Sequence, residues 1–159
     1  MLHEEFPAIA RLIRAQRVAA LGTLADGAPF ISFVAYAVEA DLCGYLIHLS
    51  GLAAHTRQLR ADPRVSLLIA EPDTPQVEDV QTLARITLSG TAEPIARETA
   101  AYSSGRARYL ERHPAAAMLF DFADFDLYRI TVSSARYVGG FARAYTLTPA
   151  HLAQAGQMA

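Results

Sequence analysis

Most of the chain alternates apolar and polar residues with the two-residue period of β-strands, and turn residues separate the alternating segments. One such turn contains Asp26-Gly27, a dipeptide that is typical of a tight β-hairpin. The strand after this turn is apolar on both faces, which suits a strand that is covered from both sides. The pattern predicts strands at Arg17–Leu24, Pro29–Val38, Tyr45–Leu49, Val65–Ala70, Gln81–Ile95 and Phe125–Val138.

Shorter segments have the three- and four-residue spacing of helices. Pro7–Ala15 places its apolar residues on one side, so a helix is expected to cover one end of the sheet. A second helix is predicted over Gly51–Ala61, and Thr148-Pro149 opens another near the end of the sequence. The expected fold is mainly β (α+β), an antiparallel barrel with flanking helices. No repeat or linker divides the chain, so residues 1–159 are predicted to form one domain.

The first candidate site follows the predicted strand Tyr45–Leu49. Ser50 stands directly before the predicted helix, in the position of an N-cap whose oxygen accepts from a free backbone amide. The free amides of a helix N-terminus bind anions, so Ser50 and the residues after it predict a phosphate site. The alternative is an ordinary capped surface helix that packs Leu52 and Leu59 on the sheet.

Composition and charge exclude several classes of protein. The formal net charge is −2, without the basic patch that nucleic-acid-binding proteins carry. No apolar run approaches the roughly eighteen residues that a membrane span requires, and the acidic N-terminus does not resemble a signal peptide. Cys43 is the only cysteine, which is typical of a reducing compartment, and the expected location is cytoplasmic. The five histidines have no zinc-ligand spacing, so no metal site is predicted.

A family resemblance rests mainly on residues 50–68, which read S-G-L-A-A-H-T-R-Q-L-R-A-D-P-R-V-S-L-L. This segment resembles a motif of the flavin split-barrel proteins related to pyridoxamine 5′-phosphate oxidase, and in particular of their haem-utilisation branch. Gln58 departs from that motif, which has asparagine there. Gly139–Ala144 resembles the G-G-F-G-x-A segment of the branch, with Ala142 in place of its third glycine. The resemblance extends roughly from Arg17 to Tyr145.

The resemblance implies a split β-barrel homodimer that binds FMN where the two subunits meet. The FMN phosphate is expected at the helix N-terminus, and arginines from other segments are expected to reach the cofactor. Arg85, five residues before Gly90, takes the place of a flavin-contacting polar residue; the alternative is an arginine that faces solvent on a one-sided sheet. The cofactor-binding residues implied are Arg17, Ser50, Gly51, Leu52, His55, Thr56, Arg85 and Arg143.

The expected function is that of an FMN-dependent oxidoreductase acting on an unidentified small-molecule redox substrate. Pyridoxamine-phosphate oxidation itself is rejected, because residues 139–159 lack the R-x-H motif of those enzymes. Two alternatives stay open: haem binding or degradation, and a flavin carrier or sensor without turnover. Haem is disfavoured, because His151 is expected in a fraying terminal helix and His55 is assigned to the FMN phosphate.

Overall fold

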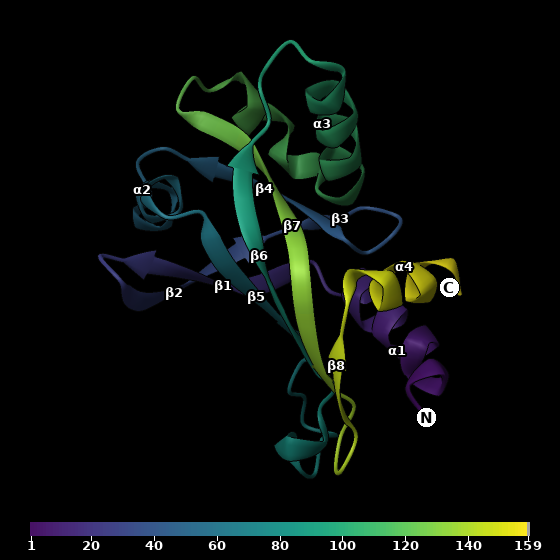
Figure 1. Cartoon of the computed structure of the whole chain (residues 1–159). Helices are drawn as coiled ribbons and strands as arrows, with labels where there is room; N and C mark the ends of the chain where they lie inside the picture. Colours follow the sequence, from purple (N-terminus) through teal and green to yellow (C-terminus); the bar gives the residue numbers. More distant parts are fainter. Residues whose placement is uncertain (159) are drawn as a thin grey trace.

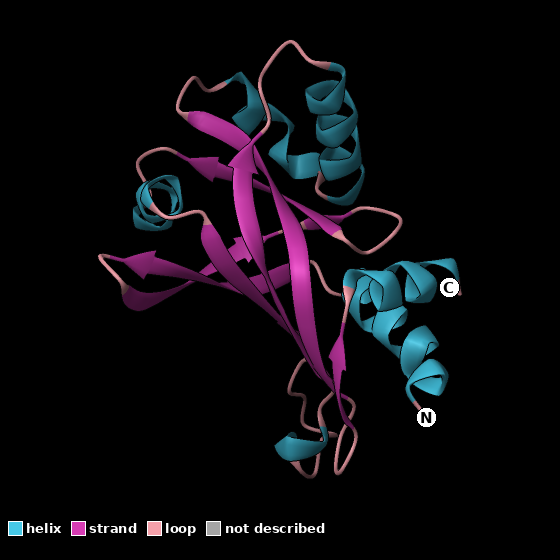
Figure 2. Ribbon diagram, viewed as in Figure 1, coloured by secondary structure: helices cyan, strands magenta, loops and turns pink. Residues whose placement is uncertain are grey.

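The computed structural model describes residues 1–158, and its centre is one strongly curled antiparallel sheet (Figures 1 and 2). The strands run in the order β2-β1-β5-β6-β7-β4-β3, and β8 pairs with the last residues of β7. The curled sheet forms the split barrel that the sequence predicts. Its strands are β1 (Val18–Ala25), β2 (Ala28–Ala35), β3 (Ala37–Val38), β4 (Gly44–Ser50), β5 (Arg64–Ala70), β6 (Arg85–Pro94), β7 (Phe125–Val138) and β8 (Ala144–Leu147).

Helices flank the sheet on several sides (Figure 2). The first and last helices pack against each other, α2 contacts β1 and β2, and α3 and the short helix η2 lie together against β7. Within residues 1–158, none of the helices is long and apolar enough to cross a membrane. Their bounds are α1 (Leu2–Ala15), α2 (Ala54–Ala61), α3 (Ala100–Arg112) and α4 (Pro149–Gln157), with 3₁₀ helices η1 (Val80–Thr82) and η2 (Pro114–Asp121).

The β1–β2 hairpin forms at the predicted Asp-Gly turn. Asp26 and Gly27 both adopt positive φ angles, of 52° and 82°, as a tight two-residue hairpin turn requires. The register that follows from this turn places Thr23 opposite Phe30 on the inner face and Gly22 opposite Ile31 on the outer face. The turn chemistry therefore decides which residues of this hairpin point toward the core.

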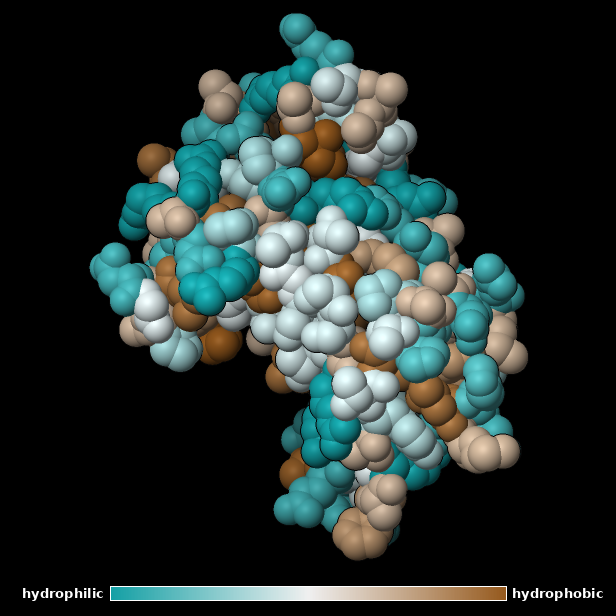
Figure 3. All heavy atoms as spheres, viewed as in Figure 1, coloured by the Kyte–Doolittle hydropathy of each residue, from teal (hydrophilic) through white to brown (hydrophobic). Residues whose placement is uncertain are grey.

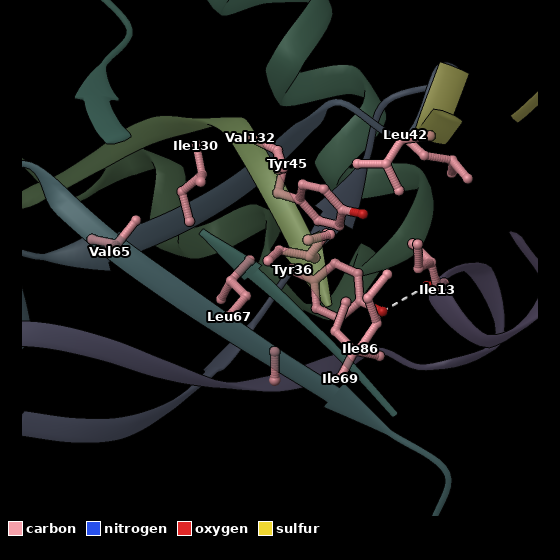
Figure 4. Packing of buried hydrophobic residues seen from close by; sticks show 14 of the residues in the cluster. Ile13, Tyr36, Leu42, Tyr45, Val65, Leu67, Ile69, Ile86, Ile130 and Val132 are labelled. Carbon is pink, nitrogen blue, oxygen red and sulfur yellow. Dashed lines mark hydrogen bonds between the residues drawn. The ribbon is translucent and has the colours of Figure 1, made fainter. Parts of the chain in front are cut away.

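The main hydrophobic core lies inside the curl of the sheet (Figure 4). Ile69 and Ile86 are fully buried there, and they are direct neighbours across β5 and β6. The Tyr36 hydroxyl donates to the Ile13 carbonyl oxygen at 2.6 Å, so a buried hydrogen bond ties α1 to this core (Figure 4). A second, smaller core lies between the sheet and the α3–η2 pair; it consists of Ala37, Leu46, Tyr109, Phe120 and Leu127.

The predicted strands agree with the structure except at two places. The strand predicted over Pro29–Val38 is interrupted at Tyr36, whose amide donates to the Arg17 carbonyl oxygen at 3.1 Å. The chain then continues as β3, which pairs with β4 instead of β1. The strand predicted from Gln81 begins only at Arg85, because the preceding residues form η1. The bulge predicted at Gly90 is confirmed by a register shift between β6 and β7.

The terminal helix is firmly packed, so the prediction that it frays is wrong. Leu152 and Ala155 of α4 are fully buried, and α4 packs along α1. The Thr148 hydroxyl oxygen accepts from the His151 amide at 3.3 Å and caps the helix N-terminus. Burial and capping together offset the tendency of a short helix to unfold near a chain end.

Candidate functional site

The loop between β4 and α2 departs from the predicted capped helix. Ser50 is the last residue of β4, and α2 begins only at Ala54, with Ala53 at the N-cap and no side-chain cap. The prediction that Ser50 caps this helix is therefore wrong. Its hydroxyl instead donates to the Asp124 carboxylate at 2.8 Å and accepts from the Leu52 amide at 3.2 Å.

Asp124 changes the electrostatics of this loop. Its backbone oxygen accepts from the Gly51 amide at 2.6 Å, and a Cβ on Gly51 would approach the same oxygen to 3.2 Å. Its carboxylate, already bonded to Ser50, repels another anion at the same place. The loop is thus held to the start of β7 by contacts that oppose a phosphate beside Ser50.

Sequence reasoning missed two arginines that pair with β7, Arg60 of α2 and Arg97 of the segment before α3. Arg60 Nε donates to the Tyr128 hydroxyl at 2.7 Å, and its Nη2 lies 2.9 Å from the Asp126 carboxylate. Arg97 approaches the other oxygen of Asp126 at 3.5 Å. The hydrogen bond to the Tyr128 hydroxyl, together with the nearby Asp126 carboxylate, raises the pKa of Arg60. No local sequence pattern indicates the cluster, because its members come from α2, β7 and the segment before α3.

The inner side of α2 packs on the β1–β2 hairpin. The Thr23 hydroxyl donates to Gln58 Oε1 at 2.6 Å, which fixes the helix at this end of the barrel. Thr56 is fully buried, and its hydroxyl has no hydrogen-bond partner among residues 1–158. His55 is half-buried, and burial lowers its pKa, so its ring is neutral at pH 7. Leu52 is 77% exposed at the start of this segment.

The predicted arginines do not join this group within one chain. Arg85 Nη1 donates to the Leu83 carbonyl oxygen at 3.1 Å. Its strand partner is Val138, and the turn that follows Val138, residues 139–143, is called the glycine hairpin. Arg143 in that hairpin forms an ion pair with Glu5 of α1 at 3.1 Å. Arg17 is exposed just before β1. In Figure 1 the start of β6 and the glycine hairpin lie at the bottom, far from α2 at the upper left.

Apart from Arg17, which lies just before β1, the predicted site residues fall into two groups in the single chain. Those around α2 are Ser50, Gly51, Leu52, His55 and Thr56, whereas Arg85 and Arg143 lie at the other end of the sheet. Which of them touch a ligand stays a prediction. The resemblance implies a homodimer. Only in such a homodimer would the two groups meet, with one group supplied by each subunit.

An exposed apolar surface covers the outside of β1, β2 and β5, and we call it the outer face. It is formed by Val18, Ile31, Phe33 and Leu68, which are 41%, 67%, 71% and 41% exposed. The register aligns Phe33 with Ala20 and Ile31 with Gly22, so small residues stand between the large ones. Brown apolar atoms over β1 and β2 mark part of this region at the left of Figure 3.

A groove of about 500 Å³ runs along the outer face, a volume typical of ligand pockets. Gly22, Ile31, Ser66, Ser89 and Gly90 form its floor and walls together with neighbouring strand residues. Thr23 also lines the groove, and Thr23 is the residue that bonds Gln58 of α2. None of the described residues that line the groove belongs to α2.

The protein has the architecture of a split barrel. Its antiparallel sheet is curled, helices flank the sheet, and the outer face is open and apolar. The model of the family described as pyridoxamine 5′-phosphate oxidase matches residues 6–139. The chain belongs to this family. The predicted family and split-barrel fold are thereby confirmed.

Comparison with individual proteins points to haem. The chain is 40% identical over 120 residues to "Non-canonical heme oxygenase HOZ, chloroplastic" of Arabidopsis thaliana, covering 76% of this chain and 35% of that protein. It is 26% identical over 125 residues to "Heme oxygenase HutZ" of Vibrio cholerae, covering 78% of this chain and 69% of that protein. A solved heme binding protein from Mycobacterium smegmatis superposes with a TM-score of 0.82 at 33% identity, covering 94% of this chain and 60% of that one.

These names correct the expected function. The prediction of an FMN-dependent oxidoreductase is wrong, because the relatives in these comparisons are named for haem, and they support the haem alternative instead. Haem is disfavoured from the sequence only if the His151 helix frays and if His55 contacts a phosphate. The helix is packed, and Asp124 stands beside the phosphate position. The chain spans about a third of the plant protein, whose name places that protein in the chloroplast, so a cytoplasmic location stays a prediction.

Proposed function

We propose that this protein binds haem at the margin of the outer face beside α2, and that it does so as a homodimer. The observation that carries the proposal is the 40% identity, across 76% of the chain, to a protein named as a heme oxygenase. Haem is thus the prosthetic group that we propose for the split barrel, and FMN binding stays a prediction.

The outer face and α2 supply groups of the kind that haem requires. The porphyrin ring is flat and apolar, and Ile31 and Phe33 offer exposed apolar surface separated by small residues. The two propionates are anions, and Arg57 is an exposed cation on α2. Bound haem would supply iron for redox or oxygen chemistry. In this proposal the protein holds the porphyrin ring, excludes water from its face and pairs its propionates with cationic side chains.

A homodimer follows from the same surface. Monomeric proteins rarely leave several large apolar side chains exposed side by side. Val18, Phe33 and Leu68 lie on adjacent strands of the outer face with large exposed fractions. A second copy that covers this face also encloses the groove, and the haem then lies between the two subunits.

Titration of the purified protein with haemin tests the proposed ligand. We expect a saturable Soret shift at one haem per chain, with a Kd below about 10 μM. FMN in the same assay, followed by quenching of its fluorescence, shows whether a flavin competes for the site. A linear, non-saturating haem response that bovine serum albumin reproduces at the same concentration would refute the proposal. Ascorbate added in air then separates binding from degradation, because degradation removes the Soret band.

Light scattering tests the homodimer. The chain mass is 17.2 kDa, so a dimer scatters as twice that mass. Phe33→Glu places a charge in the centre of the outer face and is expected to yield monomers. Met118→Glu is the matched control, because Met118 is 67% exposed in η2, outside this face. A monomeric wild-type protein at micromolar concentration, or an unchanged Phe33→Glu dimer, would contradict the assignment.

A further inference from the structure

The short helix η2 is held to the rest of the protein by one buried side chain. Phe120 is the only buried residue among its eight, and Met118 on the same helix is 67% exposed. Asp121, the only titratable residue of η2, is also exposed. A 3₁₀ helix of this length is uncommon, because its hydrogen bonds have poorer geometry than those of an α-helix. The position of η2 therefore depends on what Phe120 contacts.

Phe120 packs flat on the ring of His48 in β4. The centroids of the two rings lie 3.7 Å apart, and the angle between their planes is 5°. Tyr109 of α3 and Phe125 of β7 lie beside the imidazole, at 5.9 and 5.2 Å between centroids. His48 is 8% exposed, and neither of its ring nitrogens has a hydrogen-bond partner among residues 1–158. The anchor of η2 is thus stacked on a buried imidazole whose polar atoms are unpaired within the described chain.

This imidazole fits its place only while it is neutral. A neutral ring has one N–H group, whereas protonation gives it two N–H groups and a full charge. Burial of a charge without a partner costs far more free energy than burial of a neutral group. The pKa of His48, lowered to about 4 mainly by burial, agrees with this. Protonated His48 is therefore expected to turn toward water, and Phe120 of η2 covers one face of its ring.

The charged groups around His48 do not replace the missing partner. Arg97 before α3 disfavours a second positive charge, and Asp126 of β7 favours it. These two side chains lie 3.5 Å apart, so their fields partly cancel. From α3, the Arg106 guanidinium lies 5.3 Å from the centroid of Phe120 and adds positive charge there. Tyr109 stays neutral, because burial raises its pKa to about 12.

The segments on both sides of η2 are tied to the barrel by polar contacts. His113 precedes the helix, and its Nε2 lies 2.7 Å from the Tyr36 carbonyl oxygen. Asp124 follows the helix, and its two contacts hold Ser50 and Gly51 at the end of β4. An outward movement of η2 would therefore move Asp124 away from the loop that leads into α2.

We propose that η2 is a flap that opens when His48 is protonated. In the closed state Phe120 covers the neutral imidazole, and Asp124 holds the loop between β4 and α2. Protonation favours an open state, in which the imidazolium reaches water and the loop loses its contacts with Asp124. This acid-sensitive element is independent of the proposed haem function.

Hydrogen exchange of the full chain, followed by NMR, tests the flap. Opening takes up one proton between pH 6.5 and about pH 4, so the open population rises about tenfold per pH unit in this range. The protection factors of residues 114–124, corrected for the intrinsic effect of pH, are expected to fall about twentyfold between pH 7 and pH 5. The Gly51 amide, which bonds the Asp124 backbone oxygen, is expected to lose protection together with them. Amides between β5 and β6 report global unfolding and are expected to exchange far more slowly at each pH.

Four variants separate the proton from the packing. His48→Leu cannot be protonated, so its protection factors in residues 114–124 are expected to be the same at pH 7 and pH 5. Phe120→Ala removes the anchor and is expected to expose these amides at both pH values. Phe120→Leu keeps apolar volume and covers the case in which Phe120→Ala does not fold. Met118→Ala is the matched control on the exposed side of η2 and is expected to behave as the wild-type protein.

The outcomes that would overturn the flap are distinct. One is equal protection of residues 114–124 at pH 7 and pH 5 in the wild-type protein. Another is a fall that persists in His48→Leu, because another group would then control it. A third is exchange of η2 as slow as that of the β5–β6 amides, since η2 would then open only when the whole chain unfolds. Loss of protection in η2 without loss at Gly51 would overturn the coupling to the loop alone.

Discussion

His48 gives the strongest prediction about stability, because the structure buries it without a hydrogen bond. Burial, with the nearby charge of Arg97 as a second cause, lowers its pKa from 6.5 to about 4. The ring is stacked on Phe120 inside the smaller core. The perturbation is His48→Leu, which removes both ring nitrogens and keeps an apolar side chain of similar size.

The direction of the pH effect follows from the two protonation states. The unfolded chain takes up a proton near pH 6.5, and the folded chain only near pH 4, so unfolding is favoured as the pH falls between these values. The stability that neutral His48 contributes is fully present above pH 6.5 and is lost as the pH falls toward 4. Linkage over this window gives a loss of about 2 kcal/mol between pH 7 and pH 5. His48→Leu is expected to remove that part of the pH dependence.

At pH 7 the same variant is expected to be more stable than the wild-type protein by about 1 kcal/mol. An unsatisfied buried polar group costs about 1–3 kcal/mol, and loss of the aromatic stack offsets about 0.5–1.5 kcal/mol of the gain. Urea unfolding followed by circular dichroism at pH 7, 6 and 5 measures both effects; the chain has no tryptophan to report on unfolding. His3→Leu is the control, because His3 is exposed in α1 and its replacement leaves the smaller core unchanged.

Two results would refute the reasoning about His48. One is a wild-type dependence on pH that persists unchanged in His48→Leu. The other is a variant less stable than the wild-type protein at pH 7 by more than about 1 kcal/mol, since that would mean the imidazole has a favourable partner in solution.

Three further predictions concern local packing, each measured by urea unfolding at pH 7. Gly90→Ala should destabilise the fold by about 1–3 kcal/mol, because its Cβ would overlap the Thr131 carbonyl; an unchanged midpoint would argue against the bulge. Thr148→Ala should lower the free energy of unfolding by about 1 kcal/mol through loss of the α4 cap, and an unchanged value would show that this cap does not stabilise the protein. Arg60→Ala should cost less than about 1 kcal/mol, because its pair with Asp126 is partly exposed; a larger loss would show that the link is not screened by water.

The sequence alone predicted the features that depend on neighbours along the chain. β7 spans Phe125–Val138 as predicted, β4 is longer than its predicted range by one residue at each end, and β5 is longer by one residue at its start. Side-chain alternation decides which residues of a strand face the core, and Asp26-Gly27 decides where the hairpin turns. The family resemblance, carried by residues 50–68, was confirmed because the family model matches residues 6–139, which include this motif.

Only the tertiary structure decided the environment of the candidate site. The partner of Ser50 is Asp124, 74 residues away in the sequence, and that of Arg143 is Glu5, 138 residues away. Such pairs depend on how the sheet curls and which helices close its ends, and no local pattern encodes either. The same curl left Ile31 and Phe33 of a doubly apolar strand exposed on the outer face. His48 and His55 look equivalent as isolated histidines in the sequence. The His48 ring is stacked on Phe120 beneath η2 and is buried, whereas the His55 ring is half-buried on α2, because packing in three dimensions determines which polar atoms remain accessible.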